Sequence, residues 1–134
     1  MQFSFTFVGA SGATISVIND CGFTVWPGIS GSPVLDITGF ELAKGKSQTL
    51  QIPEVWHGQI WGRTGCTFNA SGHLSCKTGD CGSGEMGCHG RAAIPPVTLA
   101  EFEAIGFKDY YYNRVRVLVH PPKVMTPPPP QGGI

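Results

Sequence analysis

The feature that most constrains this fold is a cysteine-rich segment at residues 66–88. Four of the chain's five cysteines lie in this segment, separated by short runs that are rich in glycine. So many turn-forming residues leave little room for a helix or for a large apolar face. Cross-links must therefore hold the segment together, and local disulfide bonds are the leading candidate.

A zinc site is the alternative explanation of the cysteines. Cys76, Cys81 and Cys88, together with His73 or His89, would supply the ligand types that zinc prefers. However, four residues separate the first two of these cysteines and six separate the last two, unlike the two-residue spacing of common zinc knuckles. The segment therefore favours structural disulfides in an oxidising compartment, and we expect neither a metal nor a cofactor.

The composition of the chain favours an all-β fold in a single domain. Charged residues make up only 13% of the 134 residues, and the chain has 19 glycines and 11 prolines. The apolar runs are short and rich in β-branched residues, which is typical of strands. A net charge of zero gives no reason to expect a nucleic-acid partner, and no stretch is long enough to span a bilayer.

The local patterns predict short strands and no convincing long helix. The dipeptide Pro27-Gly28 is expected to end a strand, and Gly45 is expected to provide an unusual φ angle in a hairpin-like turn. Trp26, Trp56 and Trp61 are expected in or near the core. The predicted strands are residues 13–19, 23–26, 40–42, 47–52, 58–64, 98–102, 108–112 and 114–120.

The two ends of the chain differ from the middle. Residues 1–12 are apolar and then small, like the back half of a secretory signal, although an apolar strand at residues 3–8 is the alternative. Residues 121–134 are rich in proline and glycine, so we expect a disordered, partly polyproline II tail. The folded domain is therefore predicted to be residues 13–120.

Several motifs are spaced along about residues 13–112. One is the cysteine motif Cys76-Lys77-Thr78-Gly79-Asp80-Cys81, followed by Cys88. The others are Ala13-Thr14-Ile15, Thr24-Val25-Trp26-Pro27-Gly28, Gly58-Gln59-Ile60-Trp61-Gly62-Arg63-Thr64-Gly65-Cys66 and Thr98-Leu99-Ala100-Glu101-Phe102. In this order, and with the cysteine motif resembling the family signature, they resemble the plant thaumatin-like proteins, or pathogenesis-related family 5.

The resemblance implies a fold and a set of disulfides. The fold is all-β, a partial β-sandwich of the thaumatin type with a small disulfide-stapled loop excursion at residues 66–88. The implied bridges are Cys66–Cys76 and Cys81–Cys88. In the family, the counterpart of Cys21 pairs with a cysteine near the C-terminus that this chain does not contain, so we expect Cys21 to keep its thiol and to allow a disulfide-linked dimer. The chain is accordingly interpreted as a C-terminally truncated member.

The resemblance also implies an acidic cleft that binds carbohydrate, made in the family by one Arg, one Glu and three Asp. The Glu corresponds to Glu101, whereas the Arg falls at Gln59 and one Asp falls at Tyr112. The other two Asp have no counterpart here. Hydrolysis of a glycoside needs two carboxyl groups, so catalysis would have to recruit Asp109 or Glu103.

The remaining candidate residues are aromatic rings and a modification site. Together with Glu101, Tyr110 and Tyr111 are candidate ligand-binding residues. The two tyrosines are included because ring faces stack on sugars. Asn69-Ala70-Ser71 is a sequence for N-linked glycosylation in a turn. Arg63 and Arg91 are interpreted as making structural ion pairs rather than binding a ligand.

Three functional hypotheses follow from the sequence and the resemblance. The leading one is a secreted, apoplastic plant defence protein that binds β-1,3-glucan or another fungal cell-wall polysaccharide, impaired by truncation. The second is a weak endo-β-1,3-glucanase. The third is an inactive truncation product.

Overall fold

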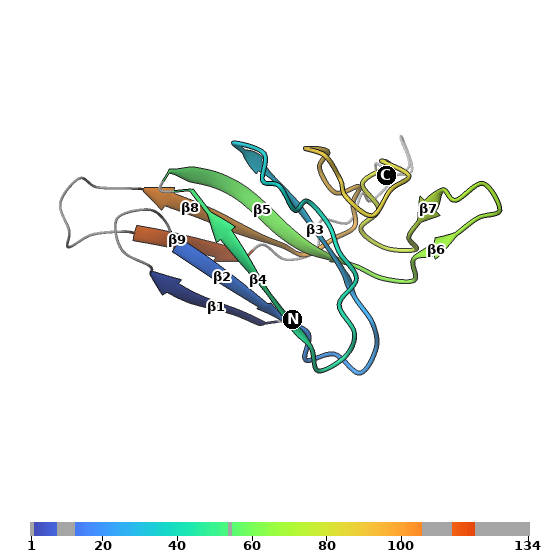
Figure 1. Cartoon of the computed structure of the whole chain (residues 1–134), viewed down its shortest axis with the longest axis horizontal. Coiled ribbons are helices and arrows are strands. Elements are labelled where there is room, and N and C mark those ends of the chain that lie inside the picture. The colour runs from blue at the N-terminus through green and yellow to red at the C-terminus, as the bar shows by residue number, and fades with distance from the viewer. Residues whose placement is uncertain (1, 8–12, 54, 106–113, 120–134) are drawn as a thin grey trace, which may run out of the picture.

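The computed structural model describes residues 2–7, 13–53, 55–105 and 114–119, which form two antiparallel sheets and a hairpin (Figure 1). The described residues contain strands and no helix, which confirms the all-β prediction. The three-stranded sheet has the order β1 (Gln2–Phe7), β2 (Ala13–Ile18), β4 (Ser47–Ile52). The four-stranded sheet has the order β3 (Trp26–Ser32), β5 (Trp56–Arg63), β8 (Leu99–Ile105), β9 (Arg114–Val119), and the hairpin is β6 (Thr67–Phe68) with β7 (Leu74–Ser75).

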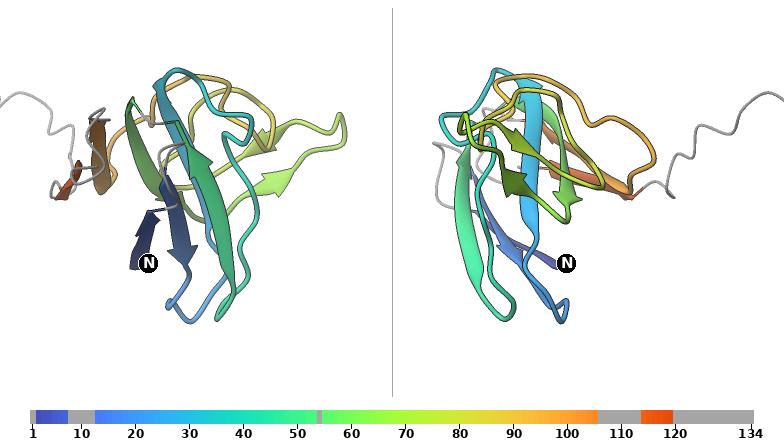
Figure 2. Two further views of the ribbon diagram at one scale, coloured as in Figure 1. Left: turned by 60° about the vertical axis from the view of Figure 1, so that its left-hand side comes forward. Right: turned by 90° about the vertical axis from the view of Figure 1, so that its right-hand side faces the viewer.

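The main hydrophobic core lies between the two sheets. Alternate residues of β2 and β4 face alternate residues of β3, β5 and β8, as the two-residue period of a strand requires. This arrangement is a β-sandwich whose strands run in similar directions, with hairpin β6–β7 projecting beyond the sheets (Figures 1 and 2). The buried members of the cluster are Ile15, Val17, Ile29, Leu42, Leu50, Ile52, Trp56, Ile60, Ala100 and Phe102.

Strand β3 corrects one prediction from the sequence. We expected Pro27-Gly28 to end a strand that began at residue 23, but β3 begins at Trp26 and runs through both residues. Proline is tolerated because β3 is at the edge of its sheet, where one row of N–H groups has no strand partner. Glycine is needed because a Cβ at position 28 would lie 2.6 Å from the Trp61 ring.

The other local predictions have mixed outcomes. Gly45 adopts a φ of 75°, and the Lys46 amide donates to the Ala43 carbonyl (3.0 Å), so the expected turn forms. It does not close a hairpin, because β4 pairs with β2 and Leu42 bridges Val25. The predicted strands at 13–19, 47–52, 58–64, 98–102 and 114–120 correspond to β2, β4, β5, β8 and β9, and 40–42 contributes only the bridge at Leu42. The predicted strand at 108–112 lies outside the described residues.

The first strand, β1, lies in the N-terminal segment that the sequence left with two interpretations. Residues 2–7 form β1, which pairs with β2 along its whole length from Gln2–Ile18 to Phe7–Ala13. This matches the alternative interpretation of the segment as an apolar strand. Among the described residues, no helix is long and apolar enough to cross a membrane.

The sandwich core makes a stability prediction for Ile60. Its side chain is fully buried between the sheets, so Ile60→Ala leaves a cavity and should lower the free energy of unfolding by about 2–5 kcal/mol. Ile94→Ala is the matched control, because Ile94 is 52% exposed and should change stability by less than about 0.5 kcal/mol. Urea denaturation of the oxidised chain measures both, and equal losses for the two variants would contradict the assigned core.

Candidate functional site

The outer face of the four-stranded sheet is the face turned away from the core. Because successive residues of a strand point to opposite sides, the burial of Trp56 and Ile60 in the core places His57 and Gln59 on the outer face. On β8, the burial of Phe102 in the core places Glu101 and Glu103 on the same outer face. Side chains with hydrogen-bonding groups therefore gather on this side of β5 and β8.

The first polar row of this face centres on Glu101. Gln59 on β5 lies directly opposite Glu101 on β8, and the Gln59 Nε2 donates a hydrogen bond to Glu101 Oε1 at 3.2 Å. Ser30 on β3 lies opposite Gln59 and extends the row. All three side chains are half-buried. Gln59, at the position where the resemblance implied an arginine in the family, thus supplies an amide donor to the Glu101 carboxylate.

The second polar row was not assembled by the sequence analysis. His57 lies opposite Glu103, and Ser32 lies opposite His57 on the other side. Arg116 occupies the register position across from Glu103 on β9. Glu103 was considered only as a possible replacement carboxylate, and His57 was missed because its strand pairing is not encoded nearby in the sequence.

A second hydrophobic cluster covers the neighbouring part of the outer face. Trp61 and Leu99, one register row beyond Gln59 and Glu101, are buried beneath the cysteine-rich segment. The Trp61 indole N–H donates to the Gly79 carbonyl at 2.8 Å, which fixes the ring under that segment. The segment therefore forms a wall beside the two polar rows. Cys81, Cys88 and Val97 complete the buried cluster.

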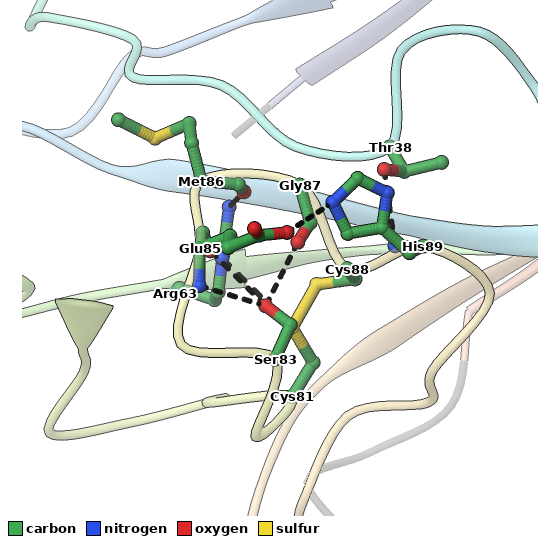
Figure 3. A network of polar contacts seen from close by, with 9 residues as sticks. All are labelled: Thr38, Arg63, Cys81, Ser83, Glu85, Met86, Gly87, Cys88 and His89. Atoms are coloured by element: carbon green, nitrogen blue, oxygen red, sulfur yellow. Dashed lines mark hydrogen bonds and ion pairs between the residues drawn. A yellow bond between two sulfur atoms is a disulfide. The ribbon is translucent and has the colours of Figure 1, made fainter. Parts of the chain in front are cut away.

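A buried arginine joins this wall to the sheet. Arg63 is 1% exposed, and its Nε donates to the Trp26 carbonyl at 2.8 Å. Its Nη2 donates to the carbonyls of Pro27 (3.2 Å) and Met86 (2.6 Å), so one guanidinium connects β5, β3 and the segment. Figure 3 shows the contact with Met86. Burial lowers the pKa of Arg63, and the charge of Asp80 opposes that shift. Arg63 is therefore structural, as expected, but it acts through backbone carbonyls instead of the ion pair predicted from the sequence.

The two disulfides join the pairs that the resemblance implied, Cys66–Cys76 and Cys81–Cys88. The four sulfur atoms are therefore not thiolates, which removes the zinc alternative built on them. No group of three potential metal-ligating side chains occurs among the described residues. Cys21 is half-exposed and lies outside both bridges.

The Cys81–Cys88 disulfide closes a loop, and polar contacts stabilise the conformation of this loop (Figure 3). The Ser83 hydroxyl donates to the Gly87 carbonyl (2.8 Å) and accepts from the Glu85 amide (3.1 Å). His89 Nε2 lies 2.6 Å from Glu85 Oε2, with both side chains mostly exposed. The His89 amide donates to the hydroxyl of the buried Thr38 (3.1 Å), which ties the loop to the chain beside β3.

The remaining predicted site residues are placed only in part. Glu101 lies on the outer face as described, and Asn69 lies in the exposed turn of hairpin β6–β7. Asp109, Tyr110, Tyr111 and Tyr112 lie outside the described residues.

The comparisons with known proteins agree with this architecture. The family model described as the Thaumatin family matches residues 19–117. The chain belongs to the thaumatin family. It is 54% identical over 99 residues to "Thaumatin-like protein 1" of Arabidopsis thaliana, covering 71% of this chain and 38% of that protein. It is 50% identical over 111 residues to "Glucan endo-1,3-beta-glucosidase" of Prunus avium, covering 79% of this chain and 45% of that protein.

A solved structure supports the same assignment of fold. The "thaumatin-like xylanase inhibitor TLXI" matches with a TM-score of 0.57 and 40% sequence identity, covering 68% of this chain and 60% of that one. The chain thus spans less than half the length of the two relatives named above. The thaumatin-like fold of the described sheets is shared with family members, whereas the activities of whole relatives remain to be tested for this chain.

Arg63 makes the second stability prediction. Arg63→Met removes the charged donor from three carbonyl groups in a buried site, so the free energy of unfolding should fall by about 3 kcal/mol. Arg91→Met is the control, because Arg91 is an exposed arginine that closely follows the cysteine-rich segment. Urea denaturation of the oxidised variants measures both, and an Arg63→Met variant within about 0.5 kcal/mol of the parent chain would contradict the anchoring role.

Proposed function

We propose that this chain is a secreted plant defence protein that binds β-1,3-glucan, a polysaccharide of fungal cell walls, on the outer face of its four-stranded sheet. The observation that carries the proposal is the hydrogen-bonded pair of Gln59 and Glu101 beside the wall formed by residues 66–88. The face offers a carboxylate acceptor and an amide side chain at adjacent positions of one sheet, next to a rigid, disulfide-braced border.

The chemistry of the face suits a polyhydroxylated ligand. Each sugar hydroxyl both donates and accepts, so it can donate to a glutamate and accept from an amide or an imidazole N–H. Hydrogen bonds to an ionised carboxylate are stronger than neutral ones. The two rows, one with Gln59 and Glu101 and one with His57 and Glu103, are two residues apart along each strand, about 7 Å, and so could contact successive parts of an extended chain. Tyr110 and Tyr111 remain proposed stacking residues.

The relatives give independent support for a polysaccharide ligand. One close relative is named for a glucan endo-1,3-beta-glucosidase, and the solved structural neighbour is titled as an inhibitor of a xylanase. The first name concerns an enzyme that acts on a β-1,3-glucan, and the second concerns an inhibitor of an enzyme that acts on a xylan. Secretion is proposed on the same family basis, together with the two disulfides, which persist in oxidising compartments.

Weak endo-β-1,3-glucanase activity is the second candidate, favoured by one specific observation. Glu101 and Glu103 share the outer face of β8, so two carboxyl groups could act on one ligand. One would have to protonate the leaving oxygen while the other activates water or attacks the sugar. The parent chain should release reducing sugar from soluble β-1,3-glucan, and both Glu101→Gln and Glu103→Gln should abolish that release. This result would support the candidate. No release by the parent chain would exclude it.

The binding prediction concerns Glu101. Glu101→Gln keeps the size of the side chain but removes the charge, and loss of a charge-assisted hydrogen bond of about 1.5–3 kcal/mol should weaken glucan binding about tenfold or more. Co-sedimentation of the chain with insoluble β-1,3-glucan over a range of glucan concentrations measures the change.

The control for this experiment is Asp36→Asn. Asp36 is an exposed carboxylate beside β4 of the other sheet, so its loss should leave binding unchanged. Parent chain that stays entirely in the supernatant would refute the proposed ligand. Binding that survives Glu101→Gln unchanged would move the site away from this face.

A further inference from the structure

Hairpin β6–β7 carries the candidate modification site on a protruding, braced turn. The hairpin projects away from both sheets, beyond the C-terminal end of β5 (Figure 1). Cys66–Cys76 joins the two ends of the hairpin, and residues 67–73 between them are all exposed. Gly72, with a φ of 79°, closes the turn in a conformation that other residues rarely adopt. Nothing in the described chain covers this tip.

The side chain of Asn69 is oriented by the turn itself. Its Oδ1 accepts from the amides of Ser71 and His73, both at 2.9 Å. Its backbone N–H donates to the His73 carbonyl (3.0 Å), and its carbonyl accepts from Gly72 (2.9 Å). These contacts use the oxygen and the backbone of Asn69 and leave the amide nitrogen directed to solvent.

Asn19 shows the opposite arrangement. Its side chain is fully buried, and its Nδ2 donates to the carbonyls of Phe23 and Leu42, both at 2.9 Å. The amide nitrogen of Asn19 is therefore committed to the fold, whereas that of Asn69 is accessible.

We infer that Asn69 is an acceptor of an N-linked glycan. The Asn69-Ala70-Ser71 sequence has the required pattern, with a residue other than proline in the middle. In the reaction, the Asn69 Nδ2 forms a bond to the anomeric carbon of a lipid-diphosphate-linked oligosaccharide. The bond from that carbon to the diphosphate oxygen breaks, the lipid diphosphate leaves with the electron pair, and one Nδ2 proton passes to a base.

The neighbouring Phe68 gives the glycan a structural consequence. Phe68, the last residue of β6 and the residue before Asn69, is 57% exposed, although a large aromatic ring is costly to leave in water. A sugar attached to Asn69 starts one residue from this ring and can extend over it with its apolar C–H face. The glycan therefore occupies the exposed tip of the hairpin, outside the two polar rows of β5 and β8.

The test is to direct the full chain into the secretory pathway of a eukaryotic host and to measure the intact mass of the secreted product. We expect an added oligosaccharide mass that a peptide N-glycosidase removes, leaving aspartate at position 69. Asn69→Gln, Ser71→Ala and Ala70→Pro should each abolish the added mass completely. Ser71→Thr preserves the acceptor pattern and should retain it.

The control for the secretory experiment is Asn19→Asp. The secreted product of this variant should still carry the glycan on Asn69. Peptide mapping of the parent chain establishes that it entered the oxidising compartment, by the presence of Cys66–Cys76 and Cys81–Cys88. Parent chain that carries both bridges but has only the mass of the polypeptide would overturn the inference. A glycan that survives Asn69→Gln would overturn the assignment of the site.

Discussion

The arrangement of this molecule depends on one buried cation, the Arg63 guanidinium. A charge taken out of water is costly unless strong hydrogen bonds replace those to solvent. Arg63 obtains them from backbone carbonyls of Trp26, Pro27 and Met86, which belong to two parts of the chain that no strand pairing joins. The planar fork of arginine suits several acceptors at once, which a lysine ammonium does less well.

This anchoring determines what remains open on the sheet. With Arg63 and Trp61 covered by residues 66–88, one end of the outer face is a dry, packed interface. The next two register rows lie beyond the covered part and carry Gln59 with Glu101 and His57 with Glu103. The disulfides and the proposed ligand face are thus connected, because the braced segment forms the border of the face.

Much of the fold could be predicted from local sequence, because alternation and turn residues act over short distances. The strand around Ile15 follows from a β-branched run, that around Ile60 follows from alternation of side chains, and the turn at Gly45 follows from the φ angle that it requires. Pro27 was misread because its tolerance depends on an edge position, which only the whole sheet defines. The pairs of cysteines came from the resemblance, since four cysteines allow three pairings and spacing alone does not choose between them.

The candidate site was less predictable for the same physical reason. Glu101 was identified through a family motif, but its hydrogen bond with Gln59 joins residues that are 42 positions apart. The row of His57 and Glu103 depends on the register of β5 against β8, and a shift of β8 by one residue would turn Glu103 into the core. Arg63 was expected to make a structural ion pair, but its partners are backbone carbonyls, which could be named only from the structure.

The most direct test of this account is side-chain hydrogen exchange in the native, oxidised chain. The Trp61 indole N–H and the Arg63 Nε–H both donate to backbone carbonyls beneath the cysteine-rich segment, so NMR should show both exchanging far more slowly than in the urea-unfolded chain. Exchange of these two protons at the unfolded rate, in a chain whose Ile60 and Phe102 amides are protected, would mean that the segment does not pack on the sheet. The outer face would then have no border, which would contradict the packing of residues 66–88 on the sheet.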